Sequence, residues 1–224
     1  MFVPKKLLAI AALSALCGLI SAASAQVITT DPSLPPVNGA YVAMGPAAAV
    51  YSGSGLTITL RNVIDTSFSN IQHVTSGANE LETFNSSATG DISFNGGPLV
   101  PVTLAGPVET ETFGKTGMTI GTFSTQMLSL DLTGNAAGHS AELMLDPTQT
   151  TTGQTTVADV GGGNFQITSF FDVFTELSLD GGPFIPQNNG PSLLTLQNMP
   201  EPSGVALLAC GGLAVLRRRS RSRM

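Results

Sequence analysis

The middle of the chain alternates apolar and polar residues with a period of two, and this feature constrains the fold most. The alternation is clearest over residues 56–61, 128–133 and 176–180. Side chains on a β-strand point alternately to its two faces, so these runs predict strands with one buried face. Clusters of Gly, Asn, Asp and Pro separate the runs: 95–98, 134–135, 161–164 and 180–183. We therefore predict an all-β antiparallel domain, a β-sandwich or jelly roll.

The composition agrees with this fold class. Of the 224 residues 42% are hydrophobic, which is enough for a core, whereas aromatic residues make up 6% and Trp is absent. Strong helix formers are few and turn residues recur, which favours strands over helices. Only residues 140–145 are ambiguous, because this segment also fits a helical turn.

Two ten-residue segments of the predicted domain resemble each other. Ile92–Pro101 and Leu177–Pro186 are offset by 85 residues, and five of the ten positions are identical. Each reads as a strand that enters a tight turn through Asn-Gly or Asp-Gly, pairs that tolerate the positive φ of hairpin turns. Two interpretations stay open: a duplicated half-domain, or two hairpins with the same turn chemistry.

The charge of the chain is distributed unevenly. From Asp31 to Asp180 there are fourteen acidic residues and only two basic ones, Arg61 and Lys115, which gives this region a net charge of −12. So acidic a domain repels a phosphate backbone, which argues against nucleic acid as a partner. It also attracts cations, and calcium stays an open question, although no EF-hand loop is present.

The N-terminus has the features of a secretory signal peptide over residues 1–25. Lys5 and Lys6 make its start positively charged, and an apolar run covers residues 7–20. A small-residue cleavage site precedes Gln26, with Ala23 and Ala25 at the key positions. We expect a signal helix here. The Pro-rich stretch 26–45 is predicted to be an extended linker or first edge segment, followed by the β-domain over 46–197.

The C-terminal residues 198–224 combine three elements in a fixed order. A short motif comes first (Pro200, Glu201, Pro202 and Ser203), and an uncharged apolar run over 204–216 follows. The run is shorter than the roughly 20 residues of a stable span, so we predict a short transmembrane helix that anchors temporarily. A basic end, which the positive-inside rule keeps in the cytoplasm, closes the chain: Arg217, Arg218, Arg219, Arg221 and Arg223.

This tail resembles the PEP-CTERM sorting signal of exported proteins in Gram-negative bacteria, many of which make extracellular polysaccharide. The segment 169–182 is also similar to one in exported PEP-CTERM proteins of planctomycete-like bacteria, whose function is unknown to us. The resemblance implies an exosortase as a partner, a membrane enzyme that cuts near the Pro-Glu-Pro motif. It implies a protein that is exported, transiently anchored in the inner membrane, and then placed at the cell surface or outside the cell.

The residue types that usually carry chemistry form no catalytic pattern. The chain has two histidines, His73 and His139, and its two cysteines, Cys17 and Cys210, lie in the end segments, so no zinc motif or mature disulfide is formed. No G-x-S-x-G motif is present. Each histidine is interpreted as a surface or turn residue. We expect no catalytic residue, no metal and no cofactor, and thus no enzyme.

Paired carboxylates are the one feature that suggests sugar chemistry. Two pairs of glutamates have i, i+2 spacing, which puts each pair on one face of a strand: Glu80 with Glu82, and Glu109 with Glu111. Glycosidases place two carboxylates about 5–10 Å apart across a cleft. Aromatic platforms for sugars are scarce, because Trp is absent and the chain has only two tyrosines, Tyr41 and Tyr51. Solvated acidic faces are the preferred interpretation.

These features together predict a non-catalytic structural or adhesive component of an extracellular matrix, associated with polysaccharide. The alternative is a secreted carbohydrate-binding or weakly hydrolytic β-sandwich. A concave sheet face lined by tyrosines and paired acids would favour the alternative.

Overall fold

The structure is a computed structural model that describes residues 25–43, 45, 47–53 and 55–199, and across these residues the chain is all-β. Among them no helix is long and apolar enough to cross a membrane. The predicted signal helix and the C-terminal transmembrane segment lie outside the described residues. The described strands are β1 (Val27–Thr29), β2 (Gly39–Ala43), β3 (Ala49–Gly53), β4 (Leu56–Ser76), β5 (Asn79–Phe94), β6 (Val100–Thr112), β7 (Gly121–Ala136), β8 (His139–Leu145), β9 (Thr152–Gly161), β10 (Asn164–Val173), β11 (Thr175–Leu179), β12 (Ile185–Pro186) and β13 (Ser192–Asn198).

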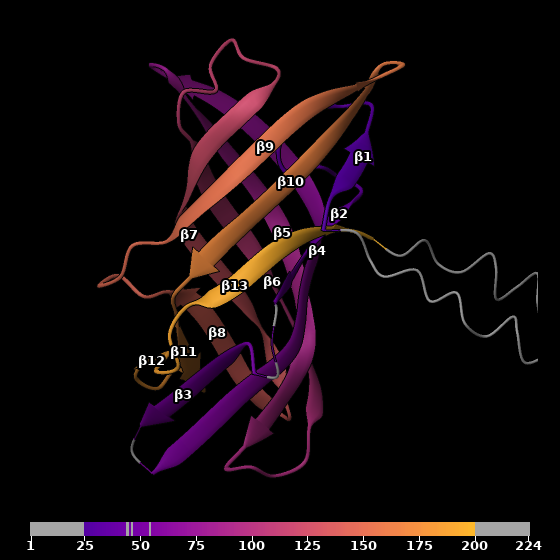
Figure 1. Cartoon of the computed structure of the whole chain (residues 1–224). Coiled ribbons are helices and arrows are strands. Elements are labelled where there is room, and N and C mark those ends of the chain that lie inside the picture. The colour runs from indigo at the N-terminus through magenta and orange to yellow at the C-terminus, as the bar shows by residue number, and fades with distance from the viewer. Residues whose placement is uncertain (1–24, 44, 46, 54, 200–224) are drawn as a thin grey trace, which may run out of the picture.

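Eight of these strands close into an antiparallel barrel. The ring runs β2, β4, β5, β6, β7, β9, β10 and β13, and β13 pairs again with β2. Figure 1 shows β9, β10 and β13 crossing the front of the barrel at a steep tilt. The prediction of an all-β antiparallel domain is confirmed, but the strands form a closed barrel where we expected a sandwich or jelly roll. Period-2 alternation specifies a buried face, and it does so equally in both architectures.

The lower end of the barrel in Figure 1 carries several further strands. There β3 pairs with β4, and β8 and β11 extend the sheet from β7. A bridge between Tyr51 and Gln187 joins these two edges. Residues 140–145, which also fitted a helical turn, lie in strand β8.

The segment 26–45, predicted to be a linker or edge segment, is an integral part of the barrel. Strand β1 pairs with β10, and β2 lies between β13 and β4. Between them Leu34 is 6% exposed and belongs to the hydrophobic core. The folded domain therefore extends from Val27 to Asn198, beyond the predicted 46–197, because the apolar residues among these prolines fill the barrel.

The two similar segments found in the sequence fold in the same way. In each hairpin the turn residue has positive φ, 50° at Asn95 and 52° at Asp180. In each, the serine two positions earlier donates to a glycine carbonyl, at 2.9 Å for Ser93 and 2.8 Å for Ser178. The side chain of the turn residue accepts from a neighbouring strand in both cases, from Thr57 N and from Ser140 N.

This equivalence extends well beyond the two turns. The β4–β5 hairpin closes at the pair Ser76 and Asn79, and the β9–β10 hairpin closes at Gly161 and Asn164, again 85 residues later. The barrel thus contains two half-barrels in which β8 with β9 corresponds to β4, and β10 with β11 corresponds to β5. A constant offset over residues 76–101 and 161–186 agrees with a duplicated half-domain.

The equivalent positions on the inner faces of β5 and β10 exchange large and small side chains. Phe84 corresponds to Ser169, and Ser86 corresponds to Phe171, and all four are buried. The phenyl rings pack edge to face, Phe84 on Phe68 and Phe171 on Tyr41, with ring centroids 5.5 Å apart in both pairs. Such exchange fills one interior from two similar halves.

Candidate functional site

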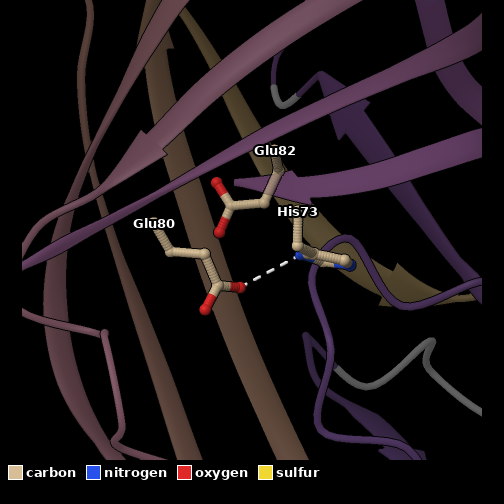
Figure 2. Close-up of side chains that lie close together, drawn as sticks. All are labelled: His73, Glu80 and Glu82. Carbon is tan, nitrogen blue, oxygen red and sulfur yellow. Dashed lines mark hydrogen bonds and ion pairs between the residues drawn. The ribbon is translucent and has the colours of Figure 1, made fainter. Parts of the chain in front are cut away.

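A polar cluster lies inside the upper end of the barrel, where the β4–β5 hairpin turns. We call it the upper cluster, and it consists of His73, Glu80, Glu82 and Lys115. His73 on β4 is the cross-strand partner of Glu82 on β5. Glu80 lies two residues earlier on the same strand and therefore on the same inner face. Figure 2 shows the imidazole of His73 facing the two carboxylates.

Glu82 is the most unusual member of this cluster, because its side chain is completely buried. Thr112 Oγ1 donates to one carboxylate oxygen at 2.9 Å, and Thr110 Oγ1 donates to the other at 3.1 Å. Burial raises the pKa of Glu82 to about 7, although these two hydrogen bonds favour the ionised form. A buried carboxylate with both oxygens held by hydroxyl groups is a fixed acceptor with a defined orientation.

Glu80 pairs with the positively charged side chain of the cluster, Lys115. Its Oε1 accepts from Lys115 Nζ at 2.8 Å and lies 3.0 Å from His73 Nδ1. Lys115 is 7% exposed, although it comes from the loop between β6 and β7. The region from Asp31 to Asp180 has only two basic residues, so placing one of them here concentrates scarce positive charge on this cluster.

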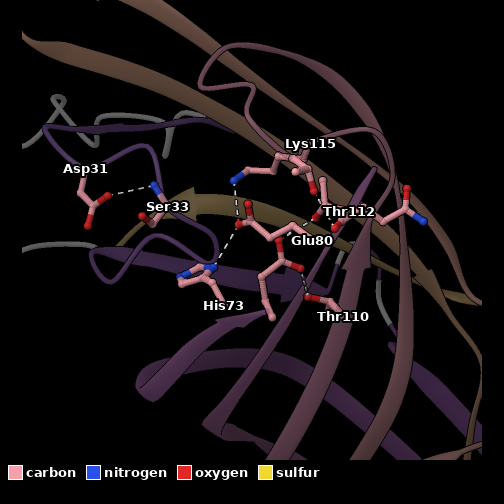
Figure 3. Close-up of polar contacts among 10 residues, drawn as sticks. Asp31, Ser33, His73, Glu80, Thr110, Thr112 and Lys115 are labelled. Carbon is pink, nitrogen blue, oxygen red and sulfur yellow. Dashed lines mark hydrogen bonds and ion pairs between the residues drawn. The ribbon is translucent and has the colours of Figure 1, made fainter. Parts of the chain in front are cut away.

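Two loops cover this end of the barrel and leave an open cleft between them. One is the segment between β1 and β2, and Figure 3 shows its Asp31 and Ser33 beside the cluster. The other is the loop between β6 and β7. The cleft is lined by residues of both loops and by Glu80: Pro32, Ser33, Lys115, Gly117, Met118 and Thr119. Small solutes therefore reach Glu80 and Lys115 from the outside.

The remaining predicted carboxylates and histidine lie elsewhere. Glu109 and Glu111 share a face as predicted, but it is the outer face of β6, where Glu111 accepts from Asn79. His139 lies at the lower end of the barrel, and its Nδ1 is 2.7 Å from Asp180 Oδ2 at the surface. The interpretation of both glutamate pairs as solvated acidic faces is wrong for Glu82, because the inward register of β5 buries it.

The two tyrosines are core residues. Tyr51 is 0% exposed and its hydroxyl lies 2.6 Å from Thr175 Oγ1, and Tyr41 donates to Ser169 Oγ at 3.0 Å. Neither ring is available to stack on a sugar.

A second buried carboxylate lies deeper in the barrel. Asp65 on β4 is 8% exposed, and its Oδ1 has no hydrogen-bond partner. It borders an apolar cavity of about 60 Å³ that is lined by small residues such as Ala43, Ala49 and Ala88. Burial raises the pKa of Asp65 to about 6.

The predicted processing residues lie mostly outside the described part of the chain. This applies to Ala23, to the motif from Pro200 to Ser203, and to the basic end at Arg217, Arg218, Arg219, Arg221 and Arg223. Of the signal-peptide cleavage site the structure describes Ala25, which is exposed, and Gln26, which is half-buried. These two residues directly precede β1.

The upper cluster can hold a cation and can exchange a proton, but it is poorly arranged for hydrolysis of a sugar. A glycosidase binds its substrate between two carboxylates that both reach it. Here Glu82 has no exposed surface, and Lys115 neutralises Glu80. Imidazole and carboxylate groups are ligands of divalent metals. Among the described residues, His73, Glu80 and Glu82 form the one group in which three such side chains converge.

The sequence alone did not reveal Thr110, Thr112 and Lys115 as partners of the glutamates. The i, i+2 spacing of Glu80 and Glu82 identified the shared face, and the i, i+2 spacing of the two threonines is the matching signal on β6. Which strand pairs with which is set by contacts distant in sequence, so these signals could not be combined.

No family model, curated protein or solved structure matches this chain.

Proposed function

We propose that this chain is an exported cell-surface protein, processed at both ends, whose barrel is a non-catalytic structural or adhesive component of the extracellular matrix. The proposed route begins with a signal peptide cut before Gln26. The tail then anchors the protein in the inner membrane until an exosortase cuts near Glu201.

The observation that carries this proposal is the fit between the folded domain and the two processing sites. The first strand begins at Val27, directly after the proposed cut, and the last strand ends at Asn198, directly before the motif. Removal of both ends therefore takes away none of the strands that the structure describes. This supports an account in which the end segments serve transport and the barrel is the mature product.

The two ends of the barrel domain also lie together. Asn38 Nδ2 donates to the carbonyl of Ile28 at 3.0 Å, and its own carbonyl accepts from Met199 N at 3.2 Å. In Figure 1 the start of β1 and the end of β13 meet on the same side of the barrel. A domain with adjacent ends can be held at one membrane surface by both segments without distortion of its fold, which supports the proposed route.

A matrix role also needs a surface that can contact polysaccharide. An open polar groove on the barrel meets this need, and its lining includes amide, hydroxyl and carboxylate groups: Asn70, Gln72, Thr83, Asn85, Glu109 and Ser129. Such groups form hydrogen bonds with sugar hydroxyls without a catalytic arrangement. Because the tyrosines are buried, the groove offers weak and extended association in place of a stacked sugar site.

The test compares the wild-type protein with Glu201→Ala in cell fractions from the native host. The proposal predicts wild-type protein at the outer surface and in the medium, and variant protein retained in the inner membrane. Asn198→Ala, next to the motif but outside it, is the matched control and should be released normally. Release of Glu201→Ala at the wild-type level would refute the role of the motif.

A further inference from the structure

The upper cluster is an addition that the barrel fold does not require. By the offset of 85 residues, Glu80 and Glu82 correspond to Phe165 and Ile167 in the second half-barrel, and the cross-strand partner of Ile167 is Val157. Ile167 and Val157 are buried apolar residues. The same architecture is thus filled by apolar side chains in one half and by His73, Glu80 and Glu82 in the other.

An apolar set would stabilise this position at least as well as the polar one. A carboxyl group loses its hydration when it is buried, and its hydrogen bonds only partly compensate for this loss. Glu82 is fully buried beside a second carboxylate, whereas the equivalent residue of the other half-barrel is the apolar Ile167. The polar residues therefore have a role other than packing.

We propose that His73, Glu80 and Glu82 bind a divalent transition metal of the zinc class at the upper end of the barrel, in exchange for Lys115. In the structure one nitrogen or oxygen donor from each residue lies within 4.8 Å of the others. Zinc bonds to nitrogen and carboxylate oxygen are about 2.0–2.2 Å long, so tetrahedral donors are about 3.4 Å apart. Metal binding therefore requires the exposed His73 and the partly exposed Glu80 to bring their donor atoms closer to Glu82.

The surroundings have the other properties of a metal site. Thr110 and Thr112 fix the orientation of Glu82, as outer hydrogen bonds commonly do for metal ligands. The cleft beside Glu80 provides an entry path and room for water as a fourth ligand. The imidazole favours zinc over calcium or magnesium, which prefer sets of oxygen ligands.

Lys115 explains how the site is stable without metal. Its ammonium group lies 2.8 Å from Glu80 Oε1, so it supplies positive charge next to the proposed ligands. A metal ion that binds Glu80 must displace this ammonium group, which can move out through the cleft that Lys115 lines. Removal of the ammonium group therefore removes a competitor of the metal.

The test is titration of zinc chloride into the purified full chain, followed by calorimetry. We expect wild type to bind one zinc ion per chain. His73→Ala and Glu82→Gln should weaken binding at least about tenfold, whereas Lys115→Met should tighten it. His139→Ala is the matched control: it removes the other histidine, which also faces a carboxylate, and should leave binding unchanged.

Several outcomes would overturn the proposal. Absence of zinc binding by wild type would do so, as would calcium binding in its place. Equal zinc affinity of wild type and His73→Ala would mean that the ion binds elsewhere. His73 is partly exposed, so its variant should fold even if Glu82→Gln does not, and circular dichroism of each variant checks this. The titration is independent of export and does not depend on the proposed function.

Discussion

Asp65 should make the stability of the barrel depend on pH in a direction that an Asn substitution removes. Its carboxyl group is buried beside an apolar cavity with Oδ1 unpaired, and burial raises its pKa from 3.8 to about 6. The folded protein therefore holds this proton more tightly than the unfolded chain. Stability from this group is fully present below pH 3.8 and is lost as the pH rises toward 6, where the folded state must bury a charge.

The magnitude follows from the size of the pKa difference. Each unit corresponds to about 1.4 kcal/mol, so Asp65 should lower the free energy of unfolding by roughly 2–3 kcal/mol between acidic and neutral pH. Asp65→Asn keeps the shape and removes the charge. Relative to wild type, it should gain this amount as the pH rises from about 4 to about 8.

Urea unfolding of wild type and Asp65→Asn across this pH range measures the effect. Glu82 contributes a shift of the same sign, but it is present in both proteins and cancels in the difference. The exposed Asp159→Asn is the control for an Asp-to-Asn change outside the barrel interior. A stability difference between Asp65→Asn and wild type that stays constant with pH would show that the buried carboxylate carries no such cost.

Four further substitutions test the fold. Asn38→Ala removes the side-chain bond to β1, so hydrogen exchange of the β1 amides should accelerate, with a loss of about 1 kcal/mol in urea unfolding. Ser93→Ala and Ser178→Ala each remove a partly buried hydrogen bond to a glycine carbonyl, and equal losses of about 1–2 kcal/mol are expected if the half-barrels are equivalent. Gly106→Ala would place Cβ 1.9 Å from the carbonyl oxygen of Asp131, so the free energy of unfolding should fall by at least about 3 kcal/mol, which thermal melting would show. A wild-type melting temperature would contradict the close approach of β6 and β7.

The sequence predicts the elements of this fold better than their assembly. The alternation at residues 56–61 and 176–180 identified strands, and the Asn-Gly and Asp-Gly pairs identified two real hairpins. Barrel closure depends on β9 and β10, which link β7 to β13. That pairing joins residues far apart in the chain, and alternation in a single strand contains no information about its neighbour.

The candidate site was predictable only in part for the same reason. The spacing of Glu80 and Glu82 placed both on one face, but the register that turns this face inward comes from contacts of the whole strand. A preference for charged residues at the surface then suggested solvation, and Glu82 is an exception that Thr110 and Thr112 make possible. Lys115 lies in a loop, where periodicity gives no prediction at all.

The most direct test of the proposed function is the intact mass of the protein recovered from the medium and outer surface. The account predicts a product that begins at Gln26 and ends near Pro200, which is the barrel with little else attached. A product that retains the C-terminal arginines would contradict it, because the tail would then not have been removed by the proposed processing.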